Sequence, residues 1–359
     1  MSDTKWRVGV IGAGFIVNYA HIPEFQRLDG VEVVAIADLN RARAEELAAA
    51  RGVPHVYEDY EKMLAEQQPN IVVVATPNIF HQPMAKTALE SGANVLLEKP
   101  MALTYADAVD IVETAKANDR VLTVGTHYRY APGSLAARHQ ADGGFFGHIY
   151  AARAVMHRRT GIPGFGSWFT RKELSGGGVL LDLGVHALDC ALFLMDFPDP
   201  VTVSASSFSA FGPRGLGLGG WGSDINKVTD AAKQFNVDDL TWATIRFADD
   251  RVLQFQVAWA SHGADQIFTE LYGTEGGARI DADEGLKLYE DLNGAPVDIA
   301  VPLPNGDGGT YRPLISNFVD YLNGDTSAHI ITTDQALLSV KIVDAIQRSA
   351  ETGREVVLG

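Results

Sequence analysis

The 359-residue sequence has little cysteine, few positive charges and no long apolar run, and each shortage excludes a class of protein. Cys190 is the only cysteine, so no disulfide can form within the chain. Lysine and arginine number 29 against 45 aspartates and glutamates, and the formal net charge of −16 disfavours nucleic acid and anionic membranes as partners. No apolar run approaches the roughly 20 residues that cross a bilayer, and the first residues do not resemble a secretory signal. We therefore expect a cytoplasmic protein of enzyme size.

The first part of the chain alternates short apolar runs with helical patterns. Five runs rich in valine and isoleucine are predicted to be strands: residues 6–12, 31–38, 71–76, 94–99 and 120–125. Their nearly continuous apolar character is typical of parallel strands covered on both faces. Helical patterns lie between them, for example at 41–52 and 104–119. Residues 1–125 are therefore predicted to form a doubly wound α/β domain of the nucleotide-binding type.

The rest of the chain has a different pattern. Longer runs with polar residues on one face are predicted to be strands: residues 148–156, 201–210, 240–248 and 251–260. Residues 270–280 read as a strand, a turn and a strand, and helical patterns return at 312–323 and 334–352. Residues 126–359 are predicted to form a second, α+β domain with an open, mainly antiparallel sheet.

A glycine loop follows the first predicted strand. In "VGVIGAGFIV", Gly12 permits a tight turn and Gly14 lets a pyrophosphate approach the backbone at a helix N-terminus. The third position of this fingerprint is Val17 instead of glycine, so an ordinary strand-to-helix turn is an alternative. A second copy of the spacing, at 215–220, is not followed by a helical pattern, and we expect residues 212–222 to be a flexible loop.

Asp38 ends the second predicted strand, about 20 residues past the glycine loop, where an acid holds the ribose hydroxyls of NAD. Because a carboxylate repels a 2′-phosphate, NAD is favoured over NADP, although Arg41 and Arg43 lie close by. The alternative role of Asp38 is to cap the next helix.

Two further strand ends carry polar residues, at the edge of the sheet where α/β folds bind ligands. Thr76, Asn78 and His81 follow the third strand, and Glu98 and Lys99 follow the fourth. A lysine near a cofactor could stabilise an alkoxide; the alternative is a lysine that reaches out to solvent from a strand end.

The stretch "SGGGVLLDLGVHALDC" places Asp182, His186 and Asp189 in an apolar segment, on one face if it is helical. Asp182 and His186 could be a hydrogen-bonded core pair, a metal site or a catalytic pair. No third ligand stands at a recognisable spacing, so we expect no metal. Asp189 is interpreted as structural.

Together the glycine loop, "ATPN..H", "EKP" and "DLGVH" resemble the glucose–fructose oxidoreductase, inositol dehydrogenase and rhizopine-catabolism (Gfo/Idh/MocA) family. The resemblance implies a Rossmann domain followed by a domain with an open antiparallel sheet that often mediates oligomerisation. It also implies NAD- or NADP-dependent redox chemistry on sugars and cyclitols, in a homo-oligomer, dimer or tetramer. Lys99, Asp182 and His186 fall on the catalytic positions: His186 as general acid/base, Asp182 to orient it or a hydroxyl, and Lys99 to bond the reacting oxygen.

The predicted cofactor-binding residues are Gly12, Gly14, Phe15, Ile16, Asp38, Thr76, Asn78, His81, Glu98 and Lys99. Segments 126–133 and 156–178 mix aromatic residues, arginine and histidine with glycine, as sugar sites do. Their candidate substrate contacts, each of which could equally be structural, are Tyr128, Arg129, His157, Arg158 and Trp168.

The function that these expectations favour is hydride transfer between a nicotinamide and a secondary hydroxyl or ketone of a sugar, glycoside or cyclitol. One alternative is a sugar–sugar oxidoreductase that keeps its cofactor bound. Another is a nucleotide-binding sensor without catalysis, although a sensor has no need of Lys99, Asp182 and His186 together. A metal-dependent hydrolase is the weakest alternative.

Overall fold

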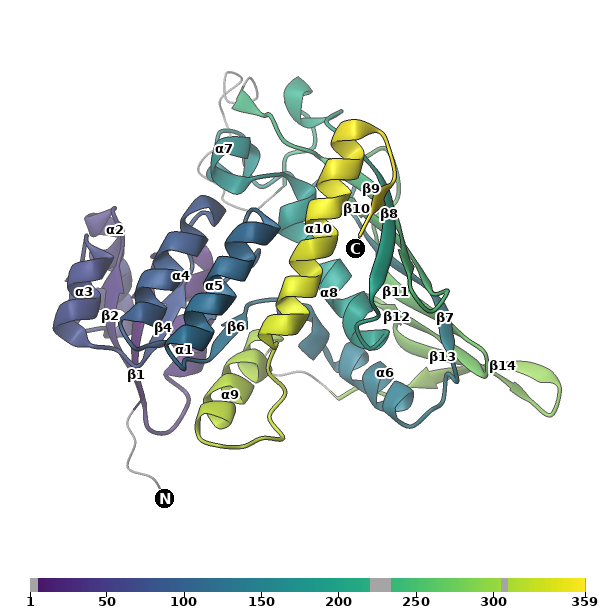
Figure 1. Cartoon of the computed structure of the whole chain (residues 1–359), viewed down its shortest axis with the longest axis horizontal. Helices are drawn as coiled ribbons and strands as arrows, with labels where there is room; N and C mark the ends of the chain where they lie inside the picture. Colours follow the sequence, from purple (N-terminus) through teal and green to yellow (C-terminus); the bar gives the residue numbers. More distant parts are fainter. Residues whose placement is uncertain (1–5, 220–233, 305–308, 359) are drawn as a thin grey trace. The chain divides into compact units, whose positions relative to one another are not determined.

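The computed structural model describes residues 6–219, 234–304 and 309–358, and the chain divides into two compact units (Figure 1). The first unit comprises residues 1–127 and 308–337, and the second comprises residues 128–307 and 338–359. This differs from the predicted second domain at 126–359, because a late segment returns to the first unit. Its helix α9 buries Ile315 and Phe318 in the same hydrophobic cluster as Val8 of the first strand.

The first unit is built on a parallel sheet of six strands in the order β3-β2-β1-β4-β5-β6. The strands are β1 (Trp6–Ile11), β2 (Val31–Ala37), β3 (His55–Tyr57), β4 (Ile71–Val74), β5 (Asn94–Leu97) and β6 (Leu122–Val124). The helices are α1 (Ile22–Phe25), α2 (Arg41–Arg51), α3 (Tyr60–Gln67), α4 (His81–Glu90), α5 (Tyr105–Ala117) and α9 (Tyr311–Leu322). The predicted doubly wound domain is confirmed, and its strand order reverses between β1 and β4, where such folds bind nucleotides.

The second unit is built on a nine-stranded sheet in the order β14-β13-β12-β11-β7-β10-β9-β8-β15. The strands are β7 (Ile149–His157), β8 (Pro200–Phe208), β9 (Leu240–Phe247), β10 (Val252–Ala258), β11 (Gln266–Gly273), β12 (Gly276–Asp281), β13 (Gly285–Leu292), β14 (Ala295–Val301) and β15 (Val356–Val357). Only the pair β7 and β10 is parallel among these neighbours, so the predicted open, mainly antiparallel sheet is confirmed.

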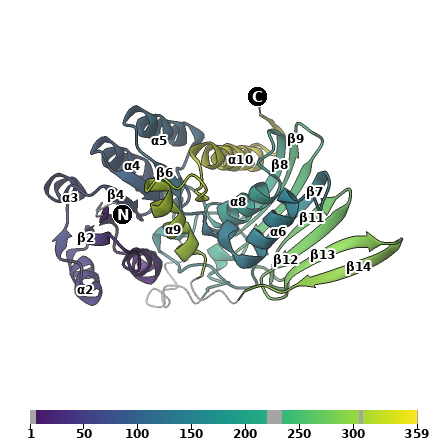
Figure 2. The same cartoon turned by 90° about the horizontal axis from the view of Figure 1, so that it is seen from below.

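Helices cover one face of this sheet. They are α6 (Pro132–Asp142), which packs on β12 and β13, and α8 (Val185–Leu194), which packs on β7, β10 and β11. The unit also contains α7 (Lys172–Ser175) and the later turns of α10 (Thr333–Thr352). Figure 2 shows α6 and α8 along one side of the sheet, and no helix of the described residues lies on the other side. The second unit therefore has a covered face and an open face.

One helical run is long and apolar enough to cross a membrane, contrary to the expectation that no such run exists. It spans residues 172–194, but 89% of its most apolar window is buried inside the protein. Its apolar side chains pack against the covered face of the sheet, for example where Gly184 lies close to Phe255 and Val257. Burial within the chain therefore accounts for its composition.

Candidate active site

The glycine loop joins β1 to a π-helical turn, η1 (Val17–His21). Gly12 has a φ of +106°, and a Cβ atom there would lie 2.3 Å from the carbonyl oxygen of Ala75, so only glycine fits. A Cβ atom on Gly14 would meet nothing within 4 Å, which leaves its backbone open to a phosphate. Val17 is fully buried in the core, where it replaces the third glycine of the fingerprint. The loop therefore fits a dinucleotide.

Asp38 follows β2, and its carboxylate is bonded to the glycine loop. Its Oδ2 accepts the backbone N–H of Ala13 at 2.7 Å, and its Oδ1 accepts that of Asn40 at 2.7 Å. Nη2 of Arg43 lies 2.8 Å from both oxygens. The alternative role of Asp38 as the cap of α2 is wrong, because Asn40 caps the helix by accepting the N–H of Arg43 at 3.1 Å. Asp38 instead stands beside the loop that a dinucleotide would occupy.

The polar residues after β4 lie at the start of a short 3₁₀ turn, η2 (Asn78–Phe80). Thr76 Oγ1 is buried and has no hydrogen-bond partner in the described part of the chain, so it is available to a ligand. The fully buried His81 has Nδ1 2.7 Å from the carbonyl oxygen of Pro100 and Nε2 2.9 Å from that of Thr76. Burial lowers its pKa in spite of these contacts. His81 therefore ties the loops after β4 and β5 together, and its ring nitrogens are engaged by the protein.

Glu98 lies at the centre of a buried polar cluster, together with His21 and Tyr311. Its Oε1 is 2.8 Å from Nε2 of His21 and accepts the hydroxyl of Tyr311 at 3.1 Å, while its Oε2 accepts the backbone N–H of Lys99 at 3.2 Å. Burial alone would raise the pKa of Glu98, but the hydrogen bond and charge of His21 and the charge of Lys99 lower it to about 2. The carboxylate thus serves to hold the segment that carries Lys99.

His127 extends this cluster. Its ring stacks on Tyr311 with 4.1 Å between centroids, and its Nδ1 forms a short hydrogen bond with the hydroxyl of Thr310. Burial lowers the pKa of His127 to about 3, although the charge of Glu98 opposes the shift. The imidazole is therefore neutral at physiological pH.

Phe15 and Ile16 lie in different surroundings, one exposed and the other packed against the core. Phe15 is 64% exposed and stacks on Tyr19 with 5.3 Å between ring centroids, so it is accessible to a ligand. Ile16 packs against the hydrophobic core of the first unit. Its side chain accordingly contributes to the fold.

In the second unit, Asp182 lies in a π-helical turn, η5 (Leu180–Gly184), immediately before α8. Single π-turns of this kind are frequent at functional sites. Asp182 Oδ2 accepts the indole N–H of Trp259 at 2.8 Å, and Trp259 is fully buried after β10. The indole therefore fixes the direction of the carboxylate.

His186 is in the first turn of α8 and is 4% exposed. The ring of Tyr128 stacks on it with 4.6 Å between centroids and an interplanar angle of 30°. One turn later, Asp189 forms a buried ion pair with Arg129, whose Nε lies 2.8 Å from Oδ2. The structural interpretation of Asp189 is confirmed, and the guanidinium of Arg129 is held by this partner.

The remaining candidate substrate residues lie elsewhere in the second unit. His157 aligns with Ala258 in the register of β7 and β10, which points it to the open face, whereas Phe255 and Val257 face the η5–α8 segment. Arg158 lines a hollow of about 440 Å³ together with Asp265 and other residues. Trp168 stacks on its neighbour Phe169 with 3.8 Å between centroids.

Sequence reasoning missed four residues of these clusters, which are His21, His127, Trp259 and Tyr311. His21 and Tyr311 meet at Glu98 from segments that no local pattern connects. Trp259 lies near the end of the predicted strand 251–260, where a buried tryptophan needs a partner for its N–H. The need of this indole N–H for a hydrogen-bond acceptor was the one signal in the sequence that could have indicated the contact.

Among the residues that the structure describes, no group of three or more metal-ligating side chains is found. The second copy of the glycine spacing, at 215–220, lies in part in an irregular loop. Gly215 and Gly217 follow the turn η6 (Gly212–Arg214), and Gly220 is outside the described residues.

Comparisons with known proteins match both units. Residues 6–126 match the oxidoreductase family with an NAD-binding Rossmann fold, and residues 134–279 match the GFO/IDH/MocA C-terminal domain. D-Glucoside 3-dehydrogenase of Escherichia coli (strain K12) is 32% identical over 362 residues, which cover 100% of this chain and 99% of that protein. 1,5-Anhydro-D-fructose reductase of Ensifer adhaerens is 31% identical over 270 residues, or 75% and 74% of the two chains.

Among solved structures, GenD2 from gentamicin A biosynthesis in complex with NAD is similar, with a TM-score of 0.80 and 27% identity over 99% of this chain and 97% of that one. The first unit is an NAD-binding Rossmann domain, in agreement with its glycine loop and strand order. On these matches, which span both units, the chain belongs to the Gfo/Idh/MocA family of oxidoreductases.

Proposed function

We propose that this protein transfers a hydride between NAD(P) and a secondary hydroxyl or ketone of a sugar, glycoside or cyclitol. The observation that carries the proposal is the polar arrangement at the start of α8. There a buried histidine, His186, is stacked on Tyr128, and the carboxylate of Asp182 is fixed by the buried indole of Trp259. The named activities of the relatives, on a glucoside and an anhydro-sugar, support the substrate class.

In the direction of oxidation, His186 accepts the proton of the reacting hydroxyl, and in reduction it returns the proton to the carbonyl oxygen. Asp182 orients the imidazole or holds a neighbouring substrate hydroxyl. Lys99 donates a hydrogen bond to the reacting oxygen and stabilises the negative charge that develops on it. The nicotinamide, when bound, accepts or supplies the hydride.

The residues proposed to hold the cofactor are Gly12, Gly14, Phe15, Asp38, Thr76 and Asn78. Those proposed to contact substrate are Tyr128, Arg158 and Trp168. We leave His81, Glu98 and Arg129 out because protein groups engage their polar atoms. His157 is left out because its strand turns it to the open face, and Ile16 because it packs in the core.

The test is reduced-nicotinamide absorbance across monosaccharides, glycosides, inositols and sugar acids, with NAD⁺ and NADP⁺ in parallel. Wild type is compared with Lys99→Ala, and with Lys86→Ala as a control, since Lys86 is paired with Asp110 on the surface. We expect turnover of at least one carbohydrate, and a loss of about 10²- to 10³-fold in kcat for Lys99→Ala only. Dinucleotide binding, followed by protein fluorescence, should persist in both variants.

Full activity of Lys99→Ala would remove the lysine from the reaction. No turnover with any single substrate, although dinucleotide binds, would favour one of two alternatives. A reaction between two sugars supplied together would indicate hydride transfer through a retained cofactor. The absence of any reaction with such mixtures would indicate a nucleotide-binding sensor.

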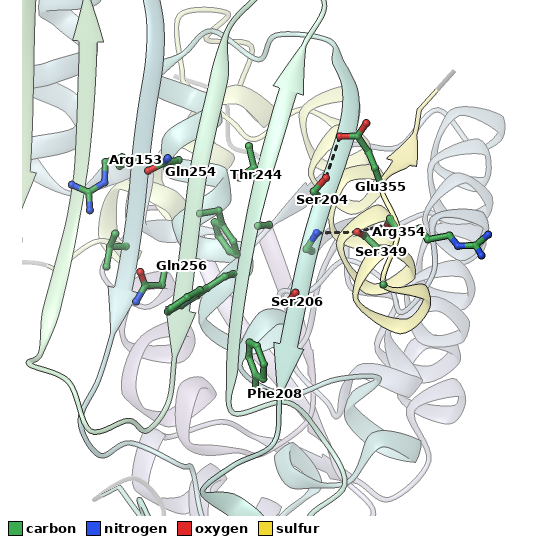
Figure 3. A pocket seen from close by; sticks show the side chains of 16 residues that line it. Arg153, Ser204, Ser206, Phe208, Thr244, Gln254, Gln256, Ser349, Arg354 and Glu355 are labelled. Atoms are coloured by element: carbon green, nitrogen blue, oxygen red, sulfur yellow. Dashed lines mark hydrogen bonds between the residues drawn. The ribbon is translucent and has the colours of Figure 1, made fainter.

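We also propose that the protein is a cytoplasmic homo-oligomer that associates through the open face of its sheet. A hollow of about 530 Å³ lies on this face. Figure 3 shows Phe208, Thr244 and Gln256 among the side chains that line it. The neighbouring Trp242 is 51% exposed, more than a large aromatic residue usually is in the absence of a partner. Light scattering should give a dimer or tetramer, and Trp242→Glu should dissociate it; a monomeric wild type would contradict this proposal.

A further inference from the structure

The helical run that carries Asp182 and His186 begins in an unusual way. It starts at Val179, directly after a run of glycines. The first N–H groups of a helix have no partner within the helix and need acceptors from elsewhere. Here the three successive N–H groups of residues 178–180 are all accepted by one residue, Asp238, which lies just before β9.

Asp238 uses both its side chain and its backbone in this contact. Its Oδ1 accepts the N–H of Gly178 at 2.7 Å, its Oδ2 accepts that of Leu180 at 2.9 Å, and its carbonyl oxygen accepts that of Val179 at 3.0 Å. A Cβ atom on Gly178 would lie 1.9 Å from the same carbonyl oxygen, so only glycine allows this approach. A negative charge is also favoured at a helix N-terminus. Asp238 therefore fixes the point at which the helix begins.

The contact leads on to Asp182 by two routes. One runs along the helix, because the N–H of Asp182 donates to the carbonyl oxygen of Gly178 at 3.1 Å. The other runs through Asp239, whose carbonyl oxygen accepts the backbone N–H of Trp259 at 2.9 Å. The indole of Trp259 in turn donates to Oδ2 of Asp182 at 2.8 Å. These bonds close a ring, in which Asp238 and its neighbour hold the backbones of both partners of the indole–carboxylate hydrogen bond.

We propose that Asp238 is a positioning residue of the active site, whose carboxylate sets the start of the helix so that Asp182 stays aligned with the indole of Trp259. Asp238 acts through Asp182 and not on the substrate. This inference rests on the proposed role of Asp182 in hydride transfer. Its first test measures the contact between Asp182 and Trp259 directly and needs no substrate.

Asp59 provides a matched control in the first unit. It caps α3 in a similar way, since its Oδ1 accepts the N–H of Glu61 at 2.8 Å and that of Lys62 at 3.3 Å. None of the proposed site residues lies in α3. Asp238→Asn and Asp59→Asn both keep the size of the side chain and replace one acceptor oxygen with an NH₂ donor. The general effect of weakening a helix cap should therefore appear in both variants.

The first measurement is hydrogen exchange of the tryptophan indole N–H groups by NMR of the full chain, with Trp259→Phe to assign the signal. The indole of Trp259 is buried and hydrogen-bonded, so it should be protected in wild type. We expect its exchange to be about 5- to 30-fold faster in Asp238→Asn, as the loss of a cap predicts. It should change by less than about 3-fold in Asp59→Asn. Asp238→Ser, which also keeps one acceptor, takes the place of Asp238→Asn if that variant does not fold.

The second measurement is steady-state kinetics with the sugar that the turnover assay identifies. In Asp238→Asn, kcat should fall about 10-fold, whereas KM and the dissociation constant of NAD⁺ should change by less than about 3-fold. In an Asp182→Ala background, Asp238→Asn should lower the residual kcat by less than about 2-fold, because the carboxylate that it positions is absent. A cap that only stabilises the helix would give the same fold-loss in both backgrounds.

The outcomes separate this inference from the proposed function. Unchanged indole exchange in Asp238→Asn, or an equal change in Asp59→Asn, would overturn the inference. Equal losses of kcat with and without Asp182 would overturn it as well. Faster exchange in Asp238→Asn, combined with a wild type that turns over no sugar, would support the positioning of Asp182 and contradict the proposed hydride transfer instead.

Discussion

Replacing Tyr311 with phenylalanine tests whether the cluster around Glu98 stabilises the first unit. The variant removes only a hydroxyl that donates to the buried carboxylate at 3.1 Å, and the ring contacts of Tyr311 with His21 and His127 remain. A hydrogen bond to a charged group contributes about 1.5 to 3 kcal/mol. Since a unit of this size loses about 2 to 4 °C in Tm per kcal/mol, we expect a decrease of roughly 3 to 12 °C.

The assay is thermal and urea unfolding of the full chain at pH 7, with Tyr321→Phe as the control. Tyr321 lies near the other end of the same helix and is 38% exposed, so its variant should unfold like wild type. The pKa of Glu98 is lowered from 4.5 to about 2, so its stabilising charge is fully present above pH 4.5 and lost as the pH falls towards 2. The difference between Tyr311→Phe and wild type should shrink over that interval. Equal stabilities of the Tyr311 and Tyr321 variants at pH 7 would refute the reasoning.

Three further predictions concern the second unit and acid stability. His186→Asn should lower kcat by about 10²- to 10⁴-fold and leave the dissociation constant of NAD⁺ unchanged, as stopped-flow and fluorescence would show; a lowered affinity with normal turnover would contradict it. Trp259→Phe should lower kcat by about 10-fold through the freed carboxylate of Asp182, whereas Trp242→Phe on the open face should not. The pKa of His127 is lowered from 6.5 to about 3 in the folded protein. As the pH falls below 6.5, this histidine is therefore protonated in the unfolded state before it is protonated in the folded state, and the free energy of unfolding decreases. His127→Gln should make urea unfolding less dependent on pH between 6.5 and 4, and an unchanged slope would count against this.

The fold was largely predictable because burial marks its strands in the sequence. The valine-rich runs of β1, β2, β4 and β5 are covered on both faces, and their composition reflects that. The strand β14 was missed because most of its residues are exposed and its pattern resembles a loop. The return of α9 to the first unit was missed for another reason. The amphipathic pattern of a helix indicates that one of its faces is buried, but it does not indicate which sheet the helix packs against.

The candidate site was predictable where chemistry follows from position along the chain. Gly12, Asp38 and Lys99 each stand at the end of a parallel strand, and the ends of such strands meet at one edge of the sheet. The contacts among the polar residues were not predictable in this way. Tyr311 reaches Glu98 across 213 residues of sequence, and His81, the first residue of α4, ties the loops after β4 and β5 together.

Arg129 shows why residue type alone does not separate a ligand contact from a structural ion pair. It stands next to Tyr128 in a segment of aromatic and basic residues, which is the composition of both a sugar site and a buried salt bridge. At 3% exposure its guanidinium has lost most of its hydration, and an acid at hydrogen-bond distance offsets that loss. Asp189 provides it from one turn beyond His186, and the resulting ion pair fixes Arg129 against α8. The choice between ligand and ion pair therefore depends on a partner 60 residues away, which the local sequence around Arg129 does not contain.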